Sequence, residues 1–317
     1  MSGIELEFML LEKESLAPLY KGVDLFSTIT MSEHMDFFAA LEQGLFKAGI
    51  PINDIHPEAA PGQFEINYEP TWGILGGDWP FVIKQAIKES ASRAGLTANF
   101  MGRPFSNTKA PNYEAGNGAH VNHSLWDLSG EKNLFHDKTR PDKVSDLCRH
   151  WVAGLVKNID AMTALVCPTV NCYRRLDGPW APSVEAWGID DRYSTIRVKN
   201  YDKTATYVEN RLPSGLVNSY LALAATIAAG MDGVINKLEP PPPRQGGEKV
   251  KMPRTLEESL VALKSSTVMR DALGEDFVDW FCALKREGEI SVLSNSDPKV
   301  DDEQAFDQEM EIYGKFI

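Results

Sequence analysis

The stretch of sequence that decides the fold reads Asp54-Ile55-His56-Pro57-Glu58-Ala59-Ala60-Pro61-Gly62-Gln63-Phe64-Glu65-Ile66-Asn67. It places acidic residues and an imidazole around a Pro-Gly turn, and the alternation after the turn sets Gln63, Glu65 and Asn67 on one face of a strand. A strand face that is this polar must look either into a cavity or into solvent. The stretch therefore predicts two strands joined by a turn. It leaves open whether Glu58 and Glu65 line a site or belong to a solvated hairpin.

A second acidic strand is expected at residues 3–11, where acidic and apolar residues alternate. Glu5 and Glu7 leave one face of this strand, whereas Ile4, Leu6 and Phe8 leave the other. Neighbouring carboxylates on one face repel each other unless a cation lies between them. The pattern thus predicts either a strand that binds a cation or an exposed sheet edge.

A glycine-rich turn, Gly116-Asn-Gly118, precedes a third strand with a polar face. Glycine allows the backbone to approach a ligand closely, and the alternation after the turn places His120, Asn122 and Ser124 on one face. A lone histidine is also commonly a hydrogen-bonded core residue. His120 therefore remains either a ligand or a core side chain.

Several arginines stand in loops or at the ends of predicted strands. A pair of arginines ends at Arg175 before a Gly-Pro loop, and Arg192 and Arg197 follow at a spacing of five. The strand at 206–213 then places Glu209 and Arg211 side by side on one face. Guanidinium groups in such places suit a bidentate grip on phosphate or carboxylate, and surface salt bridges are the alternative.

The composition excludes several classes of partner. The 317 residues carry a formal charge of -13, from 45 acidic and 32 basic residues, which argues against nucleic acid or an anionic membrane as partner. Four cysteines are too few for a disulfide scaffold and predict reduced thiols in a cytoplasmic protein. The start of the sequence has no secretion signal, and the most apolar run, residues 216–231, is too short and polar to span a bilayer.

The pattern along the chain favours an α+β fold built on an antiparallel sheet. Helical spacing of apolar residues predicts helices at 32–48, 78–94, 142–166 and 217–237. A short strand and turn are expected at 98–104, whereas residues 168–176 and 191–198 are expected to place their arginines in loops or at strand ends. Pro and Gly at 240–247 predict a mobile loop, and a capping box at Thr255 opens a tail of two or three helices running to residue 317.

The polar strand faces together offer six candidate metal ligands: Glu5, Glu7, Glu58, Glu65, His120 and Glu209. Five carboxylates cannot converge in one cleft without strong cations, and hard oxygen ligands with one nitrogen select Mg²⁺ or Mn²⁺ over zinc. With arginines nearby, this set predicts phosphoryl transfer, in which cations and guanidinium groups stabilise the developing charge.

Six segments resemble, in order, the successive motifs of the glutamine synthetase catalytic domain, type I branch. They are Glu5-Leu-Glu-Phe, the segment Glu58 to Glu65, Gly-Asn-Gly-Ala-His120, Asn-Cys-Tyr-Arg-Arg175, Arg192 to Arg197, and Val-Glu209-Asn-Arg211. They span almost the whole chain. The resemblance implies a curved, mostly antiparallel sheet that lines the active site, with helices on its outer face. It also implies that residues 1–317 form a single catalytic domain.

The resemblance also implies the ligand sets. One Mg²⁺ or Mn²⁺ would be held by Glu7, Glu58 and Glu65, and a second by three other residues, namely Glu5, His120 and Glu209. ATP would be the co-substrate. The reaction implied is ligation of glutamate to ammonia or another amine through a γ-glutamyl phosphate.

The remaining roles follow from the same resemblance. Arg175 and Arg211 would hold glutamate and its developing γ-glutamyl phosphate, whereas Arg192 and Arg197 would hold the nucleotide phosphates. Gly116, with Gly118, would lie beside the amino acid, and Ser124 near the nucleoside. The family implies a homo-oligomeric ring with small-molecule substrates as partners.

Three features depart from the family pattern. Trp180 occupies the loop in which ammonia-using enzymes carry a proton-accepting glutamate, and Asn122 replaces a histidine near the adenine. The family's N-terminal β-grasp domain is expected to be absent. The helix at 218–233 and the segment after Ala272 also resemble lengsin, a group within the family. This leaves an alternative, a non-enzymatic structural or chaperone-like protein with cytoskeletal or intermediate-filament partners.

Overall fold

The computed structural model describes residues 1–106, 115–176, 178, 180–246, 252–293, 297, 300 and 303–314. In this part of the chain one sheet runs in the order β2-β3-β1-β5-β8-β7-β6, with β4 also paired to β1. The strands are β1 (Ser2–Glu12), β2 (Ile52–Pro57), β3 (Gln63–Tyr68), β4 (Leu96–Asn99), β5 (Ala119–His123), β6 (Trp187–Ile189), β7 (Ile196–Asn200) and β8 (Thr206–Asn210). All pairings are antiparallel except β6 with β7. The predicted α+β fold with a mostly antiparallel sheet is confirmed.

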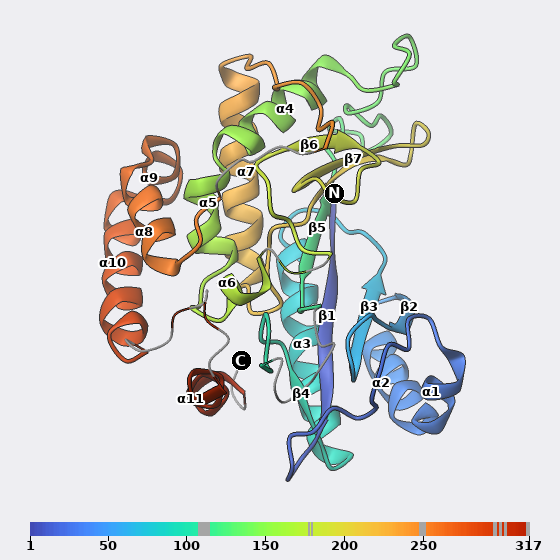
Figure 1. The fold of residues 1–317 in the computed structure, drawn as a ribbon. Coiled ribbons are helices and arrows are strands. Elements are labelled where there is room, and N and C mark those ends of the chain that lie inside the picture. The colour runs from blue at the N-terminus through green and yellow to red at the C-terminus, as the bar shows by residue number, and fades with distance from the viewer. Residues whose placement is uncertain are drawn as a thin grey trace.

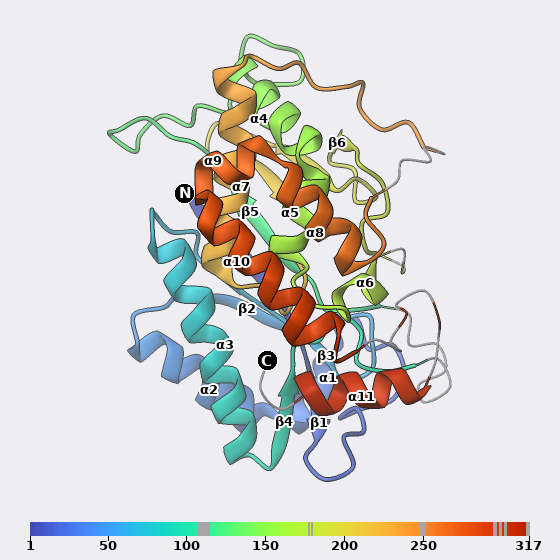
Figure 2. The ribbon, with the colours of Figure 1, turned by 90° about the vertical axis from the view of Figure 1, so that its left-hand side faces the viewer.

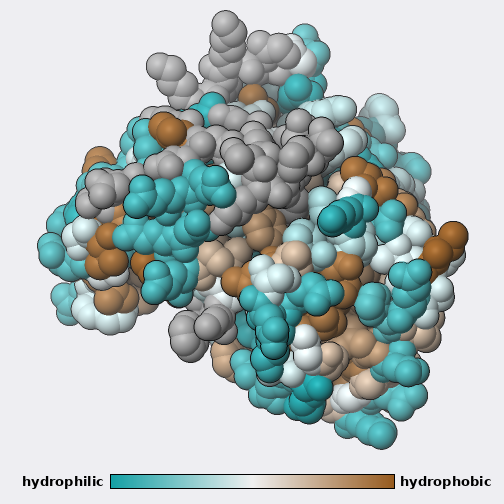
Figure 3. Space-filling model, turned by 60° about the horizontal axis from the view of Figure 1, so that its bottom comes forward, coloured by the Kyte–Doolittle hydropathy of each residue, from teal (hydrophilic) through white to brown (hydrophobic). Residues whose placement is uncertain are grey.

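Helices pack around this sheet and cover its apolar face (Figures 1 and 2). They are α1 (Thr28–Glu33), α2 (Met35–Lys47), α3 (Leu75–Arg93), α4 (Asp146–Lys157), α5 (Ile159–Val166), α6 (Cys172–Arg175), α7 (Ser219–Ile235), α8 (Leu256–Ser265), α9 (Thr267–Leu273), α10 (Glu275–Lys285), the π-helical turn η1 (Arg286–Ile290) and α11 (Glu303–Tyr313). In the view of Figure 2, α8, α9 and α10 form an outer layer over α5 and α7. On the face seen in Figure 3, hydrophobic residues gather in the middle of the surface, between hydrophilic areas.

The alternation of β1 separates the core from the polar face. Ile4, Leu6 and Phe8 are buried in the main hydrophobic core, where the Phe8 ring lies 6.0 Å from that of Phe64. Burying a side chain of this size contributes roughly 1.5–3 kcal/mol, so the apolar face of β1 fixes the strand in place. Glu5 and Glu7 consequently leave the opposite face, as the sequence predicts.

The strand register then brings distant acidic residues together. Glu7 lies opposite Glu65 in the β1–β3 pair, and Glu5 lies opposite His120 in the β1–β5 pair. Glu209 of β8 lies opposite Asn122 of β5. Directly opposed residues have close Cβ atoms, so three neighbouring strand pairs concentrate these side chains on one face of the sheet.

Two of the predicted helices are each broken into two. The helix expected at 32–48 becomes α1 and α2 because His34 adopts a non-helical backbone, φ -121° and ψ 24°. The helix expected at 142–166 starts only after Ser145, which caps α4, and breaks at Asn158. The Asn158 side chain donates hydrogen bonds to the carbonyl of Gly154 and to Asp232, so this residue ends α4 instead of continuing it.

The second half of the chain holds elements that the sequence pattern did not predict. Strand β6 and the single turn α6 were missed because both are too short to show a period. The Thr255 cap is confirmed, since its side chain accepts a hydrogen bond from the Glu258 amide. The described part of the tail then holds four α-helices and a π-helical turn, more than the two or three expected. Residues 240–246 form the predicted loop, and Gly247 lies outside the described residues.

The expectations for membranes and thiols can be compared with the structure. Among the described residues, we find no helix that is long and apolar enough to cross a membrane. All four cysteines are free and buried: Cys148, Cys167, Cys172 and Cys282.

Helices α4 and α7 cross with their backbones in close contact, and substitution of a glycine at the crossing tests this contact. A Cβ on Gly154 would lie 2.2 Å from the Ala229 carbonyl oxygen and 2.6 Å from the Gly233 nitrogen, both backbone atoms. We expect Gly154→Ala to lower the free energy of unfolding by about 2 kcal/mol or more, because the two helices must move apart. Gly44 of α2 has open space around it, so Gly44→Ala should instead stabilise by roughly 0.5–1 kcal/mol. Urea denaturation of both variants checks this, and equal effects would contradict the close helix contact.

Candidate active site

The polar face of the sheet opens into a cavity of about 360 Å³. All six candidate metal ligands line it, and so do four arginines and Gly116. The full set of predicted site residues on its wall is Glu5, Glu7, Glu58, Glu65, His120, Glu209, Gly116, Arg175, Arg192, Arg197 and Arg211. Gly118 and Ser124 lie beside it, as described below.

The first cluster of ligand atoms consists of Glu5, His120 and Glu209, whose donor atoms lie within 4.8 Å of one another. His120 Nδ1 lies 3.0 Å from Glu5 and 3.7 Å from Glu209. Burial alone would raise the pKa of Glu5, but hydrogen bonding and charge from His120 lower it to about 2. Both carboxylates of this cluster are therefore ionised at neutral pH, since the pKa of Glu209 is also lowered, by His120, Arg211 and Lys199 against burial and the charge of Glu5.

The second cluster consists of His56, Glu58 and Glu65. His56 of β2 lies opposite Glu65 of β3, and its Nε2 is 3.5 Å from the Glu65 carboxylate. Burial, together with the charges of Glu7 and Glu65, raises the pKa of Glu58 to about 7. Burial opposes the charged form of His56, but Glu65 and Glu58 raise its pKa to about 9. The raised pKa of Glu58 reflects repulsion from the carboxylates of Glu7 and Glu65, which a bound cation would relieve.

Glu7 lies next to both clusters. One of its carboxylate oxygens accepts hydrogen bonds from Gln63 Nε2 at 3.0 Å and from the Gly118 amide at 2.7 Å. The other oxygen is 3.9 Å from His120 Nε2. Burial raises the pKa of Glu7, and the nearby Glu65 charge raises it further. Glu7 therefore lies beside His120 of the first cluster and opposite Glu65 of the second, and its charge raises the pKa of Glu58.

Both clusters fit a divalent cation. Their donors are carboxylate oxygens with one imidazole nitrogen each, a hard set that suits Mg²⁺ or Mn²⁺. Each group already gathers three donors within 4.8 Å, so little rearrangement is needed to bind an ion.

Three of the four arginines on the cavity wall donate hydrogen bonds to neighbouring residues of the site. Arg211 donates to the Glu209 carboxylate at 2.5 Å, and Arg197 donates to the other Glu209 oxygen at 3.1 Å. Arg175 is buried, donates to the Leu212 and Arg211 carbonyls, and has Nη2 3.4 Å from His120 Nε2. Burial lowers the pKa of Arg175. Arg192 lines the cavity from an exposed position.

The two glycines of the 116–118 turn lie close to neighbouring atoms of the site. A Cβ on Gly118 would lie 2.6 Å from Arg175 Nη2, and a Cβ on Gly116 would lie 2.0 Å from the Gly102 carbonyl oxygen. Real Cβ atoms do not approach this closely. At Gly116 the neighbouring atom is backbone, so only glycine fits there, whereas a side chain at residue 118 would force the Arg175 guanidinium to move.

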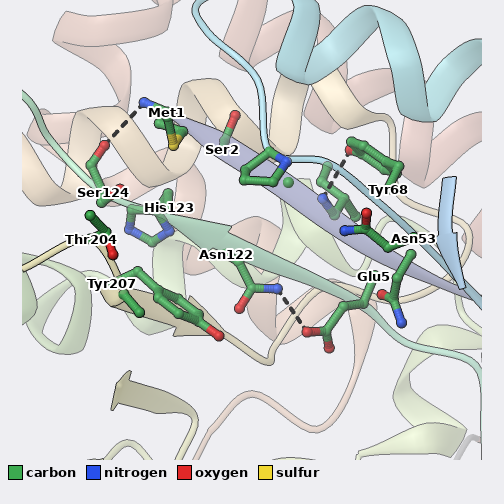
Figure 4. A pocket seen from close by; sticks show the side chains of 15 residues that line it. Met1, Ser2, Glu5, Asn53, Tyr68, Asn122, His123, Ser124, Thr204 and Tyr207 are labelled. Atoms are coloured by element: carbon green, nitrogen blue, oxygen red, sulfur yellow. Dashed lines mark hydrogen bonds between the residues drawn. The ribbon is translucent and has the colours of Figure 1, made fainter. Parts of the chain in front are cut away.

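A second cavity, also of about 360 Å³, adjoins the first and shares Glu5 with it. Ser124, Asn122 and Tyr207 line it (Figure 4). The Asn122 side chain donates to Glu5 at 2.9 Å, and the Ser124 hydroxyl accepts from Trp126. Glu5 therefore stands in the wall between the two cavities.

Lys84 of α3 supports the loop that backs the site. Its Nζ donates to the carbonyls of Gly215 and Val217 at 2.7 and 3.1 Å, and the Gly215 amide donates to Asn117 in the glycine turn. Burial, and next the charge of Lys88, lowers the pKa of Lys84 to about 7.

The lowered pKa of Lys84 can be tested by the dependence of stability on pH. The ordinary pKa of lysine is near 10.5, so between about pH 7 and 10.5 the unfolded state binds more protons than the folded state. We expect the free energy of unfolding to rise with pH over this range, by an amount on the order of several kcal/mol at most. Urea denaturation at pH 7, 8.5 and 10 measures this slope, which should be shallower in Lys84→Met. Parallel slopes in the two proteins would contradict the depressed pKa.

Several site residues were not singled out from the sequence. His56 lies two residues before Glu58, so alternation places the two on the same face of a strand, and His56 faces Glu65. This spacing was present in the stretch quoted at the start. Lys199 lies 3.5 Å from Glu209 and, two residues after Arg197 on β7, leaves the same face of the strand. Leu25 and Phe26, which also line the cavity, lie before α1 in a segment without any pattern. Conversely, Arg174 was expected beside Arg175 but turns away to Glu309.

Comparison with known proteins agrees with this geometry. The glutamine synthetase catalytic domain family matches residues 1–302. Glutamate–methylamine ligase of Methyloversatilis universalis is 39% identical over 314 residues, covering 90% of this chain and 67% of that protein. Glutamine synthetase of Thermotoga maritima is 33% identical, covering 88% and 66%, and lengsin of the dog is 31% identical, covering 82% and 46%.

A solved structure is also similar to this chain in fold. GmaS in complex with ADP superposes with a TM-score of 0.84 at 27% identity, covering 93% of this chain and 70% of that one. The chain spans about half to two thirds of the length of the curated relatives named above. The chain belongs to the glutamine synthetase family and carries its catalytic domain.

Proposed function

We propose that this chain carries the catalytic domain of an ATP-dependent ligase that joins the γ-carboxylate of glutamate to ammonia or an amine. The observation that carries the proposal is the meeting of two carboxylate–imidazole clusters and four arginines in one cavity. A set of like charges costs stability unless it binds cations, so its retention favours a catalytic use over a purely structural one. Relatives named as glutamate–methylamine and glutamate–isopropylamine ligases support the same reaction class.

In this proposal Glu5, His120 and Glu209 hold one Mg²⁺ or Mn²⁺. Glu58, Glu65 and Glu7 hold a second, with His56 beside them. Ions bound in such sites supply positive charge to the phosphate oxygens of ATP.

The other residues take the parts implied by their places in the two cavities. Arg175 and Arg211 bind glutamate and stabilise the charge that develops on its γ-carboxyl during phosphorylation. Arg192 and Arg197 bind the nucleotide phosphates. The backbone at Gly116 and Gly118 lies beside the amino acid, and Ser124 faces the nucleoside from the second cavity.

The reaction then proceeds in two displacements. An oxygen of the γ-carboxylate attacks the γ-phosphorus of ATP, the bond to the bridging oxygen breaks, and ADP leaves. The amine nitrogen then attacks the acyl carbon, inorganic phosphate leaves, and the nitrogen loses a proton to give the amide. The cavity supplies positioning and charge, which dominate catalysis of phosphoryl transfer.

Phosphate release tests the proposal. The purified chain is assayed with ATP, Mg²⁺, glutamate, and ammonium or an amine, beside Glu58→Ala and the exposed control Glu69→Ala. Release that needs both glutamate and the amine, and that is lost only in Glu58→Ala, would support a ligase. Absence of release, with Mn²⁺ and ADP still raising the melting temperature, would overturn catalysis and leave a nucleotide-binding relative of lengsin.

We also propose the setting implied by the family. Residues 1–317 act as a single catalytic domain within a homo-oligomeric ring in the cytoplasm. Four buried free thiols support a reducing compartment, and the ring is what the resemblance to the family implies.

A further inference from the structure

Three apolar side chains stand on the wall of the charged cavity: Leu25, Phe26 and Trp180, together called the apolar rim. Phe26 is 63% exposed and Trp180 is 62% exposed, and Leu25 is exposed as well. These side chains therefore contribute little to the core. Large exposed apolar groups on the wall of a site that also holds carboxylates and guanidinium groups suit an apolar part of a ligand.

The backbone at the rim is strained. Phe26 has φ +58° and Trp180 has φ +67°, in the left-handed region that bulky residues seldom adopt. Among the described residues only six other than glycine have positive φ, and two of them are the aromatic residues of this rim. Strain of this kind persists where the surrounding structure fixes it, and it concentrates at functional sites.

Each aromatic residue of the rim is tied to one of the two clusters. The Phe26 ring packs edge-on against His56 with ring centres 4.8 Å apart, and its amide donates to the Pro57 carbonyl. The Trp180 carbonyl accepts a hydrogen bond from Arg211 Nη2 at 3.0 Å, and Arg211 in turn holds Glu209. The rim is thus anchored to the groups that, under the proposed function, activate the γ-carboxylate.

We infer that the apolar rim binds the alkyl group of a primary alkylamine and so selects an alkylamine over ammonium as the second substrate. This inference rests on the proposed function. The amine enters as the free base, its nitrogen forms the bond to the acyl carbon as phosphate leaves, and it gives up one proton. The alkyl group has no polar atom, so it gains by leaving water for the faces of Trp180 and Phe26, whereas ammonium gains nothing there.

The size of the preference follows from the area removed from water. Each buried methylene contributes about fourfold in kcat/KM, and a well-fitted pocket contributes about tenfold or more. A carboxylate at position 180 would remove this apolar face and offer ammonium a charged partner. Trp180→Glu is therefore expected to shift selectivity toward ammonium, and Phe26→Ala is expected to lower the rate with alkylamines more than the rate with ammonium.

The experiment is a competition at fixed glutamate, ATP and Mg²⁺. Ammonium, methylamine, ethylamine and isopropylamine are mixed at equal concentration, and the γ-glutamyl amides are quantified by mass spectrometry. Wild type should favour alkylamides by tenfold or more, and Trp180→Glu should lower that ratio at least tenfold with unchanged KM for glutamate and ATP. Trp280→Glu on α10 is the matched control, because Trp280 is also 62% exposed but lies outside the cavity, and its ratio should equal that of wild type.

The outcomes separate this inference from the proposed function. Hydroxylamine serves as a small nucleophile that needs no apolar contact. The rim inference would be overturned if wild type formed the γ-glutamyl hydroxamate but preferred ammonium to the alkylamines. It would also be overturned if the ratio of alkylamide to glutamine were the same in Trp180→Glu and Phe26→Ala as in wild type. Either result would leave the ligase activity standing. Wild type that forms neither hydroxamate nor any amide would overturn the proposed function itself.

Discussion

Replacing Glu209 with glutamine is expected to lower kcat/KM of the ligase reaction by about 10³-fold or more while leaving the chain folded. Glu209 is 1% exposed and belongs to the cluster with Glu5 and His120. Each of its oxygens is bound by an arginine, Arg211 on one side and Arg197 on the other. The neutral amide keeps the size of the side chain but removes the charge that a divalent cation requires.

Two measurements separate this effect from misfolding. Calorimetric titration with Mn²⁺ should lose one of two binding events in Glu209→Gln, whereas the melting temperature should fall only moderately because Arg197 keeps its bond to Asp190. The control is Glu69→Gln, at an exposed position beyond the end of β3, which should bind both ions and react at the wild-type rate. A Glu209→Gln variant with more than a tenth of wild-type activity would contradict the assignment of this cluster.

The second large effect is expected at the buried ion pair of Arg174 and Glu309. Arg174 Nε and Nη2 lie 2.8–3.0 Å from the Glu309 carboxylate, and the guanidinium stacks over Phe306 at 4.2 Å. Both side chains are almost fully buried. Removing one partner leaves the other charge uncompensated, so Glu309→Gln should lower the free energy of unfolding by about 3–5 kcal/mol.

A double variant makes this prediction specific. Arg174→Met with Glu309→Leu removes both charges and should recover most of the loss, because a buried pair can be replaced by apolar residues of similar volume. The exposed pair of Arg286 and Glu257 has a similar bidentate geometry, and Glu257→Gln should cost less than about 1 kcal/mol. Equal losses in Glu309→Gln and Glu257→Gln would contradict the account. So would a double variant no more stable than Glu309→Gln.

The same ion pair bears on the site, because α6 carries neighbouring arginines with different partners. Consecutive residues of a helix point about 100° apart, so Arg175 faces His120 while Arg174 faces α11. Read as part of a loop, both arginines could face a ligand, and the sequence offered no periodicity by which to separate them. This difference arises from a single helical turn that only tertiary packing stabilises.

Other parts of the site could be predicted from local pattern alone. Alternation in residues 3–11 correctly placed Glu5 and Glu7 on one face, because the opposite face carries Ile4 and Leu6 into the core. The meeting of Glu5 with His120 and Glu209 could not be derived in this way. It depends on the register of β1, β5 and β8, which are more than 80 residues apart in sequence and paired by core packing. That grouping came from the family resemblance.

Trp180 departs from the family pattern in sequence, and only the structure shows which residues share a cavity with it. In the sequence it was a residue that cannot accept a proton, standing where a carboxylate was expected. In the structure it lines the same cavity as Phe26, although the two are far apart in the chain. Both residues have a left-handed backbone, which the sequence does not reveal for residues other than glycine, and both lie on the wall of one cavity.

The central claim is that glutamate is activated as an acyl phosphate in the cavity between the two clusters. The most direct measurement uses glutamate labelled with ¹⁸O in its γ-carboxylate, incubated with the chain, ATP, Mg²⁺ and an amine. The account predicts that one ¹⁸O atom appears in each inorganic phosphate released, because phosphate leaves with an oxygen that belonged to the carboxylate. Phosphate released without label would mean that water, and not glutamate, attacks ATP, and would contradict the account.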